Sequence, residues 1–244
     1  MAQDNKVFDL HHGYLLRTDL CAGVHTTRVA KKFEWFGLTL LKRYLEKNVV
    51  IRDVHDNPQY YSKGIDLIVQ GKETFSIDLK TDSYMGTDPM RKIKGQCNPD
   101  SGVMLIETIS QLQYNRNKSD VPGWFFTSEA DEIYYYYLAV LNEAQELTDI
   151  HSEYKMKIKS KTDTRSVEDN LIKALKVDND MLVTYNLKKA RKWLSDNIDE
   201  LKISYSGATN PTYVTVSLRI PRELFLEPSG PGRNLGRVYP KILE

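Results

Sequence analysis

The sequence lacks several features that define specialised classes of protein. It contains two cysteines among its 244 residues, Cys21 and Cys97, without a CxxC spacing or a nearby histidine, which excludes a disulfide scaffold and argues against a zinc site. Long apolar runs are also lacking, since stretches such as 133–141 fall far short of the roughly 20 residues that a membrane-spanning helix needs. The N-terminus has polar and charged residues where a signal peptide needs an apolar core. We therefore expect a cytoplasmic protein with no membrane partner.

An excess of either charge is missing too. The chain has 34 Lys and Arg residues against 33 Asp and Glu residues, a net charge of +1, so a nucleic-acid partner would have to bind a local basic surface. Hydrophobic residues make up 41% of the chain and charged residues 27%, ordinary values that exclude a disordered polypeptide. A length of 244 residues allows one large domain or two small ones.

The spacing of apolar residues predicts an α/β fold in which a mixed central β-sheet is flanked by helices. The expected helices lie at 27–47, 166–176 and 188–198. The expected strands lie at 49–51, 64–70, 74–80, 103–107, 124–127, 133–141, 183–187 and 213–220. A long surface loop is expected at 81–100. The predicted organisation is an N-terminal arm at 1–25, a core at 26–142, α/β elements packing on that core at 143–227, and a flexible basic tail at 228–244.

Apolar and polar residues alternate along two runs between Gly64 and Lys80, which predicts a β-hairpin with one apolar face. Because the apolar residues must share that face, the register of the hairpin can be deduced around a loop centred on Lys72. The apolar pairs in this register are Val69 with Phe75, Leu67 with Ile77, and Ile65 with Leu79. The same register sets Asp66 directly opposite Asp78.

Two carboxylates that face each other across a strand pair repel, so a neighbouring positive charge must offset the cost. Lys80 lies two residues after Asp78 and therefore on the same face of the strand. A hard divalent cation would supply further positive charge, because such ions bind one or two carboxylates together with phosphate oxygens and water. The alternative is a hairpin whose polar face is simply solvated, with Lys80 screening the acids.

These residues, together with a preceding helix that carries an acid, resemble the core of the PD-(D/E)XK nuclease superfamily, which includes restriction endonucleases and phage or archaeal Holliday-junction resolvases. The resemblance rests on Gly64-Ile65-Asp66-Leu67 and Ile77-Asp78-Leu79-Lys80 and covers about 29–141. It implies a restriction-endonuclease-like core with a C-terminal α+β extension, in which Asp66 is the first metal-binding acid, Asp78 the second and Lys80 the lysine. The acid of the first helix corresponds to Glu34, whose alternative interpretation is an exposed helix residue without a role in the site. Ile65 stands where the name of the motif has proline, at a position that varies within the family.

The resemblance implies a DNA endonuclease of phage or mobile-element type that uses Mg²⁺, or Mn²⁺ in its place, and leaves 5′-phosphate and 3′-hydroxyl ends. Asp66, Asp78 and Glu34 would hold one or two ions with the help of the backbone carbonyl of Leu79, and Lys80 would orient or activate the attacking water. Nicking, junction-resolving and restriction-type activities all remain open, and a homodimer would suit cleavage of both strands. The alternative is a catalytically inactive nuclease-fold protein that binds nucleic acid or a protein partner.

Other charged residues admit two interpretations. Glu107 at the end of an expected strand is either an additional metal ligand or an ordinary surface acid. The basic runs at 91–94 and 155–161 either contact phosphates or form solvated faces. None of the five histidines accompanies a Ser or Cys nucleophile motif, so the sequence gives no support to triad chemistry.

Overall fold

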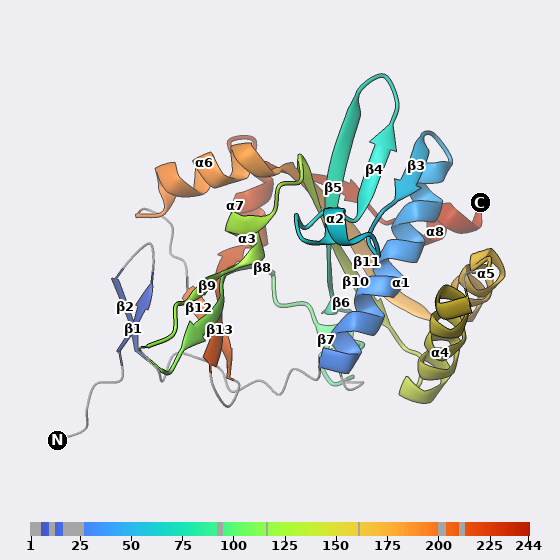
Figure 1. The fold of residues 1–244 in the computed structure, drawn as a ribbon, viewed down its shortest axis with the longest axis horizontal. Helices are drawn as coiled ribbons and strands as arrows, with labels where there is room; N and C mark the ends of the chain where they lie inside the picture. The colour runs from blue at the N-terminus through green and yellow to red at the C-terminus, as the bar shows by residue number, and fades with distance from the viewer. Residues whose placement is uncertain are drawn as a thin grey trace. The chain divides into compact units, whose positions relative to one another are not determined.

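The fold is given by a computed structural model of the chain (Figure 1). The residues that the structure describes are 6–9, 13–16, 27–91, 95–115, 117–160, 162–199, 204–209 and 213–244. They fall into two compact units, each considered separately below. Unit 1 takes in residues from 1–25, 102–128 and 188–231, and unit 2 takes in residues from 26–101, 129–187 and 232–244. Each unit therefore draws on both of the sequence ranges 26–142 and 143–227.

Unit 2 is built on a six-stranded mixed sheet with the strand order β14-β11-β10-β5-β4-β3. Its strands are β3 (Val50–Asp53), β4 (Leu67–Gln70), β5 (Thr74–Asp82), β10 (Glu132–Val140), β11 (Val177–Asn186) and β14 (Gly232–Gly236). β5 and β10 pair in parallel at the centre, and every other neighbouring pair in this sheet is antiparallel. The predicted α/β class with a mixed central sheet is thus confirmed. A short parallel pair, β6 (Tyr84–Gly86) and β7 (Asn98–Pro99), lies within 81–100.

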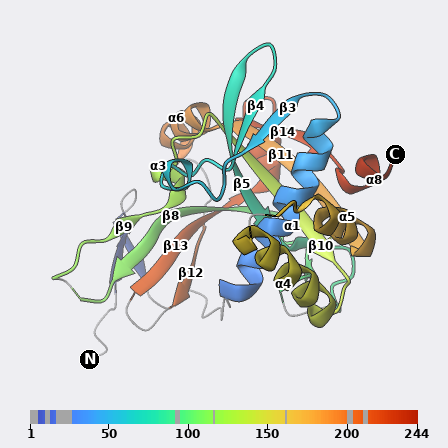
Figure 2. The ribbon, with the colours of Figure 1, turned by 45° about the vertical axis from the view of Figure 1, so that its right-hand side comes forward.

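One face of this sheet is covered by α1 (Thr27–Glu46), α4 (Ala144–Ser160) and α5 (Arg165–Ala174), as the two ribbon views show together (Figures 1 and 2). The helix α1 is buried on all sides from 35 to 41, and its side chains Phe33, Phe36, Leu40 and Leu41 are at most 4% exposed. They join the side chains of β4, β5 and β10 in one apolar core. The helix α4 contributes Leu147, His151 and Tyr154 at spacings of four and three residues. No helix among the described residues is long and apolar enough to cross a membrane.

The helix α1 approaches β5 closely at Gly37. A Cβ atom at this position would overlap Thr81 Oγ1 and lie 3.0 Å from Thr81 Cγ2. With Thr81 in this position, a larger residue at 37 would force the helix or the threonine side chain to shift. Gly37 is one turn after Glu34, and Thr81 directly follows Lys80, so the contact joins the two elements beside the predicted catalytic residues.

Unit 1 contains an antiparallel four-stranded sheet with the order β12-β13-β8-β9. Its strands are β8 (Val103–Gln113), β9 (Val121–Pro122), β12 (Ser204–Thr209) and β13 (Tyr213–Pro221). Its helices are α3 (Trp124–Thr127), α6 (Leu187–Asn197), which begins in the last residue of unit 2, and α7 (Arg222–Leu226). Within the predicted arm at 1–25, the described residues form the hairpin of β1 (Lys6–Asp9) and β2 (Gly13–Leu16). Cys21 lies outside the described residues, and Cys97 is a buried free thiol.

The prediction of a strand at 124–127 is wrong, because these residues form the short helix α3. An apolar run of this length fits a buried strand and a buried helical turn equally well. In the structure, Arg191 supports the helical turn. It donates from Nε to the carbonyl of Phe125 at 2.7 Å and from Nη2 to the carbonyl of Ser128 at 2.7 Å. Its guanidinium satisfies carbonyl groups that the end of a helical turn leaves unpaired.

The segment 228–244, expected as a flexible tail, instead supplies the edge strand β14 and the helix α8 (Tyr239–Leu243). The buried carboxylate of Asp180 anchors it. Asp180 Oδ1 accepts a hydrogen bond from Arg237 Nε at 3.0 Å, and Oδ2 accepts from the backbone N–H groups of Val238 and Tyr239 at 2.6 and 2.8 Å. The predicted loop at 81–100 likewise has a packed interior, where Met85, Gln96 and Cys97 are buried.

Candidate active site

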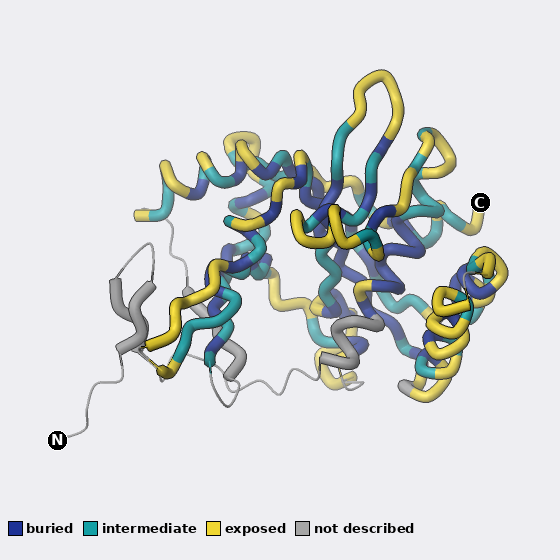
Figure 3. Tube along the Cα trace, in the orientation of Figure 1, coloured by how far each residue is buried: buried dark blue, intermediate teal, exposed yellow. Residues whose placement is uncertain are grey.

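The hairpin that carries the predicted acids has the expected register. The structure pairs Leu67 with Ile77 and Val69 with Phe75 across β4 and β5, with the turn at its tip. The base of the hairpin is buried and the tip is exposed (Figure 3). Asp66 is the residue immediately before β4, and continuing the register by one residue brings it opposite Asp78. Period-two burial of the apolar face explains why the prediction succeeded.

Hydrogen bonds hold Asp66 at the end of the ladder. Its backbone N–H donates to the carbonyl of Ile77 at 2.9 Å, and its carbonyl accepts from the N–H of Val54 at 2.9 Å. Its side chain turns towards β5, where Oδ2 accepts from the backbone N–H of Leu79 at 2.8 Å. The other carboxylate oxygen, Oδ1, is therefore left to coordinate a metal ion. The carboxylate is therefore fixed in orientation by the strand that carries Asp78 and Lys80.

Asp78 is the most buried member of the group, with 1% of its surface exposed. The ammonium nitrogen of Lys80 lies 2.6 Å from Asp78 Oδ1. Beyond this ion pair, neither carboxylate oxygen of Asp78 accepts a well-oriented hydrogen bond from any described residue. Buried carboxylates are normally satisfied by several hydrogen-bond donors, so this one has unused capacity to bind a cation.

The electrostatics of the group follow from burial and from the two opposed acids. Burial and the charge of Asp78 raise the pKa of Asp66 from 3.8 to about 6, against the opposite influence of Lys80. Burial by itself would lower the pKa of Lys80, but the charges of Asp78 and Asp66 outweigh it and raise that pKa. Lys80 is therefore a cation at neutral pH, and its single positive charge interacts with both Asp66 and Asp78.

Glu34 lies on the exposed side of α1 and is close enough to Lys80 for its charge to raise the pKa of that lysine. The described residues contain no group of three or more His, Cys, Asp or Glu side chains arranged to hold a metal ion, and a ligand role for Glu34 stays a prediction. The structure therefore assembles Asp66, Asp78 and Lys80 and places Glu34 at their margin. The role of the Leu79 carbonyl stays a prediction.

The two opposed acids offer the number of carboxylates that a protein-bound magnesium ion typically uses. Mg²⁺ is typically bound by one or two protein carboxylates, with water and substrate phosphate oxygens completing its octahedron. Beyond the ion pair with Lys80, the oxygens of Asp78 accept no hydrogen bond from the described residues, and Asp66 uses only Oδ2 to accept from the backbone. A third protein carboxylate is not required for this mode of binding.

The remaining predicted residues lie elsewhere. Glu107 is in the middle of β8 in unit 1, whereas the two opposed acids belong to unit 2. In the basic run 91–94, Arg91 is exposed, and Lys92 to Lys94 lie outside the described residues. The run 155–161 is on α4, where Lys155 and Lys159 are exposed. His11, His12 and His25 also lie outside the described residues.

Sequence reasoning missed polar contacts made by residues distant in sequence. The hydroxyl of Tyr135 donates to Asp82 Oδ2 at 2.9 Å, on the same face of the sheet as Lys80. Tyr134 and Tyr136 face the other way, into the apolar core under α1, as expected for a strand. Asp53 and His55 form a second polar cluster, for which the only local signal is the spacing of an acid two residues from a histidine.

The chain matches no protein-family model, no curated protein and no solved structure.

Proposed function

We propose that the chain is a magnesium-dependent DNA endonuclease of phage or mobile-element type that hydrolyses phosphodiester bonds to 5′-phosphate and 3′-hydroxyl ends. The observation that carries the proposal is the meeting of Asp66, Asp78 and Lys80 at the base of one hairpin. The opposition of the two acids follows from burial of the apolar face of that hairpin, independently of any motif. Asp78 is buried, and beyond its ion pair with Lys80 its oxygens accept no hydrogen bond from the described residues, which supports a catalytic role over a solvated surface.

The residues divide the expected chemistry among them. Asp66 and Asp78 would hold the ion, and Mg²⁺ when bound would lower the pKa of a water molecule and neutralise charge on the phosphate. Lys80 carries its ammonium group beside the acids, where it can donate hydrogen bonds to the attacking water and to the oxygens of the pentavalent phosphorus. Glu34, at the margin, would add negative charge that keeps Lys80 protonated.

A second candidate is a nuclease-fold protein that binds nucleic acid or a protein partner without cleaving. The 2.6 Å ion pair between Lys80 and Asp78 favours it, because the lysine already neutralises the buried acid without a metal ion. The two candidates can be distinguished by cleavage. Only the nuclease would cleave DNA, and it would do so only with a divalent cation present.

The test is incubation of the purified protein with supercoiled plasmid, linear duplex and four-way junction DNA, in Mg²⁺, in Mn²⁺ and in EDTA. We expect cleavage in either metal and none in EDTA, with 5′-phosphate ends on the products. Asp78→Asn and Lys80→Ala should each reduce the rate by about a hundredfold or more, as removal of a group that stabilises developing charge usually does.

The matched control is the exposed ion pair of Lys192 and Asp196 on α6, whose Nζ to Oδ2 distance of 2.7 Å is nearly that of Lys80 and Asp78. Lys192→Ala and Asp196→Asn should leave cleavage unchanged. Equal cleavage by all variants would identify a contaminating nuclease and remove the proposal. DNA binding without cleavage of any DNA form in either metal would favour the non-cleaving candidate.

A further inference from the structure

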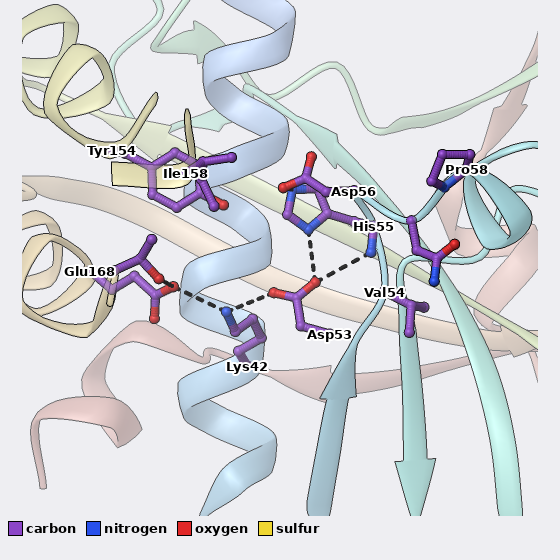
Figure 4. Close-up of a pocket in the computed structure, with 11 residues that line it drawn as sticks. Lys42, Asp53, Val54, His55, Asp56, Pro58, Tyr154, Ile158 and Glu168 are labelled. Carbon is purple, nitrogen blue, oxygen red and sulfur yellow. Dashed lines mark hydrogen bonds and ion pairs between the residues drawn. The ribbon is translucent and has the colours of Figure 1, made fainter. Parts of the chain in front are cut away.

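Unit 2 contains a hollow of about 560 Å³ between α1, the connection from β3 to α2 (Pro58–Tyr61) and the pair of helices α4 and α5 (Figure 4). Its size lies within the range of about 300 to 1,000 Å³ that is typical of small-molecule sites. All of its lining residues belong to unit 2. The nuclease proposal assigns no role to this cavity.

Charged side chains of alternating sign line one side of the cavity, in the order Glu168, Lys42, Asp53, His55, Asp56 (Figure 4). Lys42 Nζ lies 3.1 Å from Glu168 Oε1 and 2.7 Å from Asp53 Oδ2. His55 Nδ1 lies 2.8 Å from Asp53 Oδ1, and its Nε2 lies 3.2 Å from Asp56 Oδ2. The two ends of this series, Glu168 and Asp56, are both acids.

The series has a deficit of positive charge. It contains three carboxylates and two bases, so it retains one negative charge even when His55 is protonated and two when it is neutral. Burial would raise the pKa of Asp53, but His55 and Lys42 outweigh it and hold that pKa at about 2. Asp53 is therefore ionised at neutral pH, and carboxylates outnumber basic groups in the lining.

Tyr154 of α4 adds a neutral polar group to the lining. The residue is 7% exposed, lines the cavity, and stacks on Trp35 with ring centroids 4.3 Å apart. Burial and the nearby charges of Asp56, Asp53 and Glu168 raise the pKa of Tyr154, so it stays a neutral hydroxyl at ordinary pH. The phenolic oxygen already bonds to the side chain of Trp35, and its second lone pair can accept a hydrogen bond from a cationic donor without adding charge to the cavity.

We propose that this cavity binds a small alkylammonium compound of the diamine or polyamine class. One of its ammonium groups would lie at Asp56 and another at Glu168, the acids at the two ends of the series, with the hydroxyl of Tyr154 as a further acceptor. Its alkyl chain would lie against Ile158 and Pro58, two of the apolar residues of the lining. Oxygens of Asp53 and Glu168 are already bonded to Lys42, and within the described part of the chain no three potential ligands are arranged for a metal ion, which favours an organic cation.

The experiment is isothermal titration calorimetry of the full chain, free of DNA and magnesium, at low salt. The probes are 1,4-diaminobutane, spermidine, MgCl2, and 1,4-butanediol as the neutral analogue of the diamine. We expect saturable binding of one amine per chain and no binding of the diol. Asp56→Asn should weaken amine binding by about tenfold, as loss of one charge-assisted hydrogen bond does, and Tyr154→Phe by a smaller factor.

Asp56 has 59% of its side chain exposed, so its substitution should leave the fold intact, which circular dichroism will check. Asp196→Asn, an exposed acid of unit 1, is the matched control and should bind the amine like the wild type. The inference fails if the diol binds equally well or no amine binds at millimolar concentration. It also fails if both cavity variants bind amines normally, or if Mg²⁺ occupies the same site and displaces the amine. Because no DNA is present, these outcomes are independent of the nuclease proposal.

Discussion

Replacement of Asp66 by Asn should stabilise the metal-free protein at neutral pH. Folding buries the Asp66 carboxylate opposite Asp78 and raises its pKa from 3.8 to about 6. Since each tenfold change in proton affinity corresponds to about 1.4 kcal/mol, holding this group ionised in the fold costs up to about 3 kcal/mol above pH 6. Asn keeps an oxygen to accept the hydrogen bond of the Leu79 N–H but has no charge to bury.

The pH dependence of this effect has a definite sign. The pKa of Asp66 is raised in the folded state, so its cost is present in full above about pH 6 and is lost as the pH falls to the unfolded value of 3.8. The difference in free energy of unfolding between Asp66→Asn and wild type should therefore be about 1 to 3 kcal/mol at pH 8 and close to zero at pH 4. The lower bound allows for the cost of burying the amide itself.

Urea denaturation in EDTA, followed by circular dichroism at several pH values, measures this difference. Asp196→Asn serves again as the exposed control and should show no comparable gain. Added Mg²⁺ should raise the stability of the wild type more than that of Asp66→Asn, because a ligand that binds only the folded state stabilises it. A variant that is less stable than wild type at pH 8, or a difference that does not shrink towards pH 4, would refute the electrostatic reasoning.

Two further substitutions test how the site is supported. Gly37→Ala should lower the free energy of unfolding by about 1 to 3 kcal/mol, because its methyl group would overlap Thr81, and Thr81→Ala should restore part of the loss in a urea titration of the double variant. Asp180→Ala should cost about 3 to 5 kcal/mol, because it leaves Arg237 and neighbouring backbone N–H groups without their buried acceptor. Limited proteolysis should then cleave within 232–244 before the rest of unit 2, and early cleavage elsewhere would contradict the anchoring role.

The elements that the sequence predicted well are those in which burial imposes a strict period. The register of the β4–β5 hairpin followed from alternation, and the helix α1 followed from apolar residues at helical spacing. The opposition of Asp66 to Asp78 is a consequence of that register and needed no further information. Lys80 was also assigned correctly to the face of Asp78, since their side chains form an ion pair.

The features that escaped prediction depend on partners far away in the chain. Lys42 meets Glu168 across a separation of 126 residues, so no local pattern links them. The strand β14 is short and rich in glycine, and it is held by pairing with β11 and by Asp180 rather than by its own propensity. The helix α3, found where a strand was expected, has its Phe125 carbonyl bonded to Arg191, which lies 66 residues further along the sequence.

The central sheet of unit 2 is assembled from three separate stretches of chain, and its edge strand β14 is separated from β11 by the whole of 188–231. During synthesis, the edge of β11 that pairs with β14 therefore stays unpaired until more than forty residues of unit 1 have been made. At typical elongation rates this interval lasts roughly two to nine seconds. An unpaired strand edge in this interval is a template for intermolecular pairing. The yield of native protein should therefore fall as temperature and expression rate rise, because both favour pairing between incomplete chains.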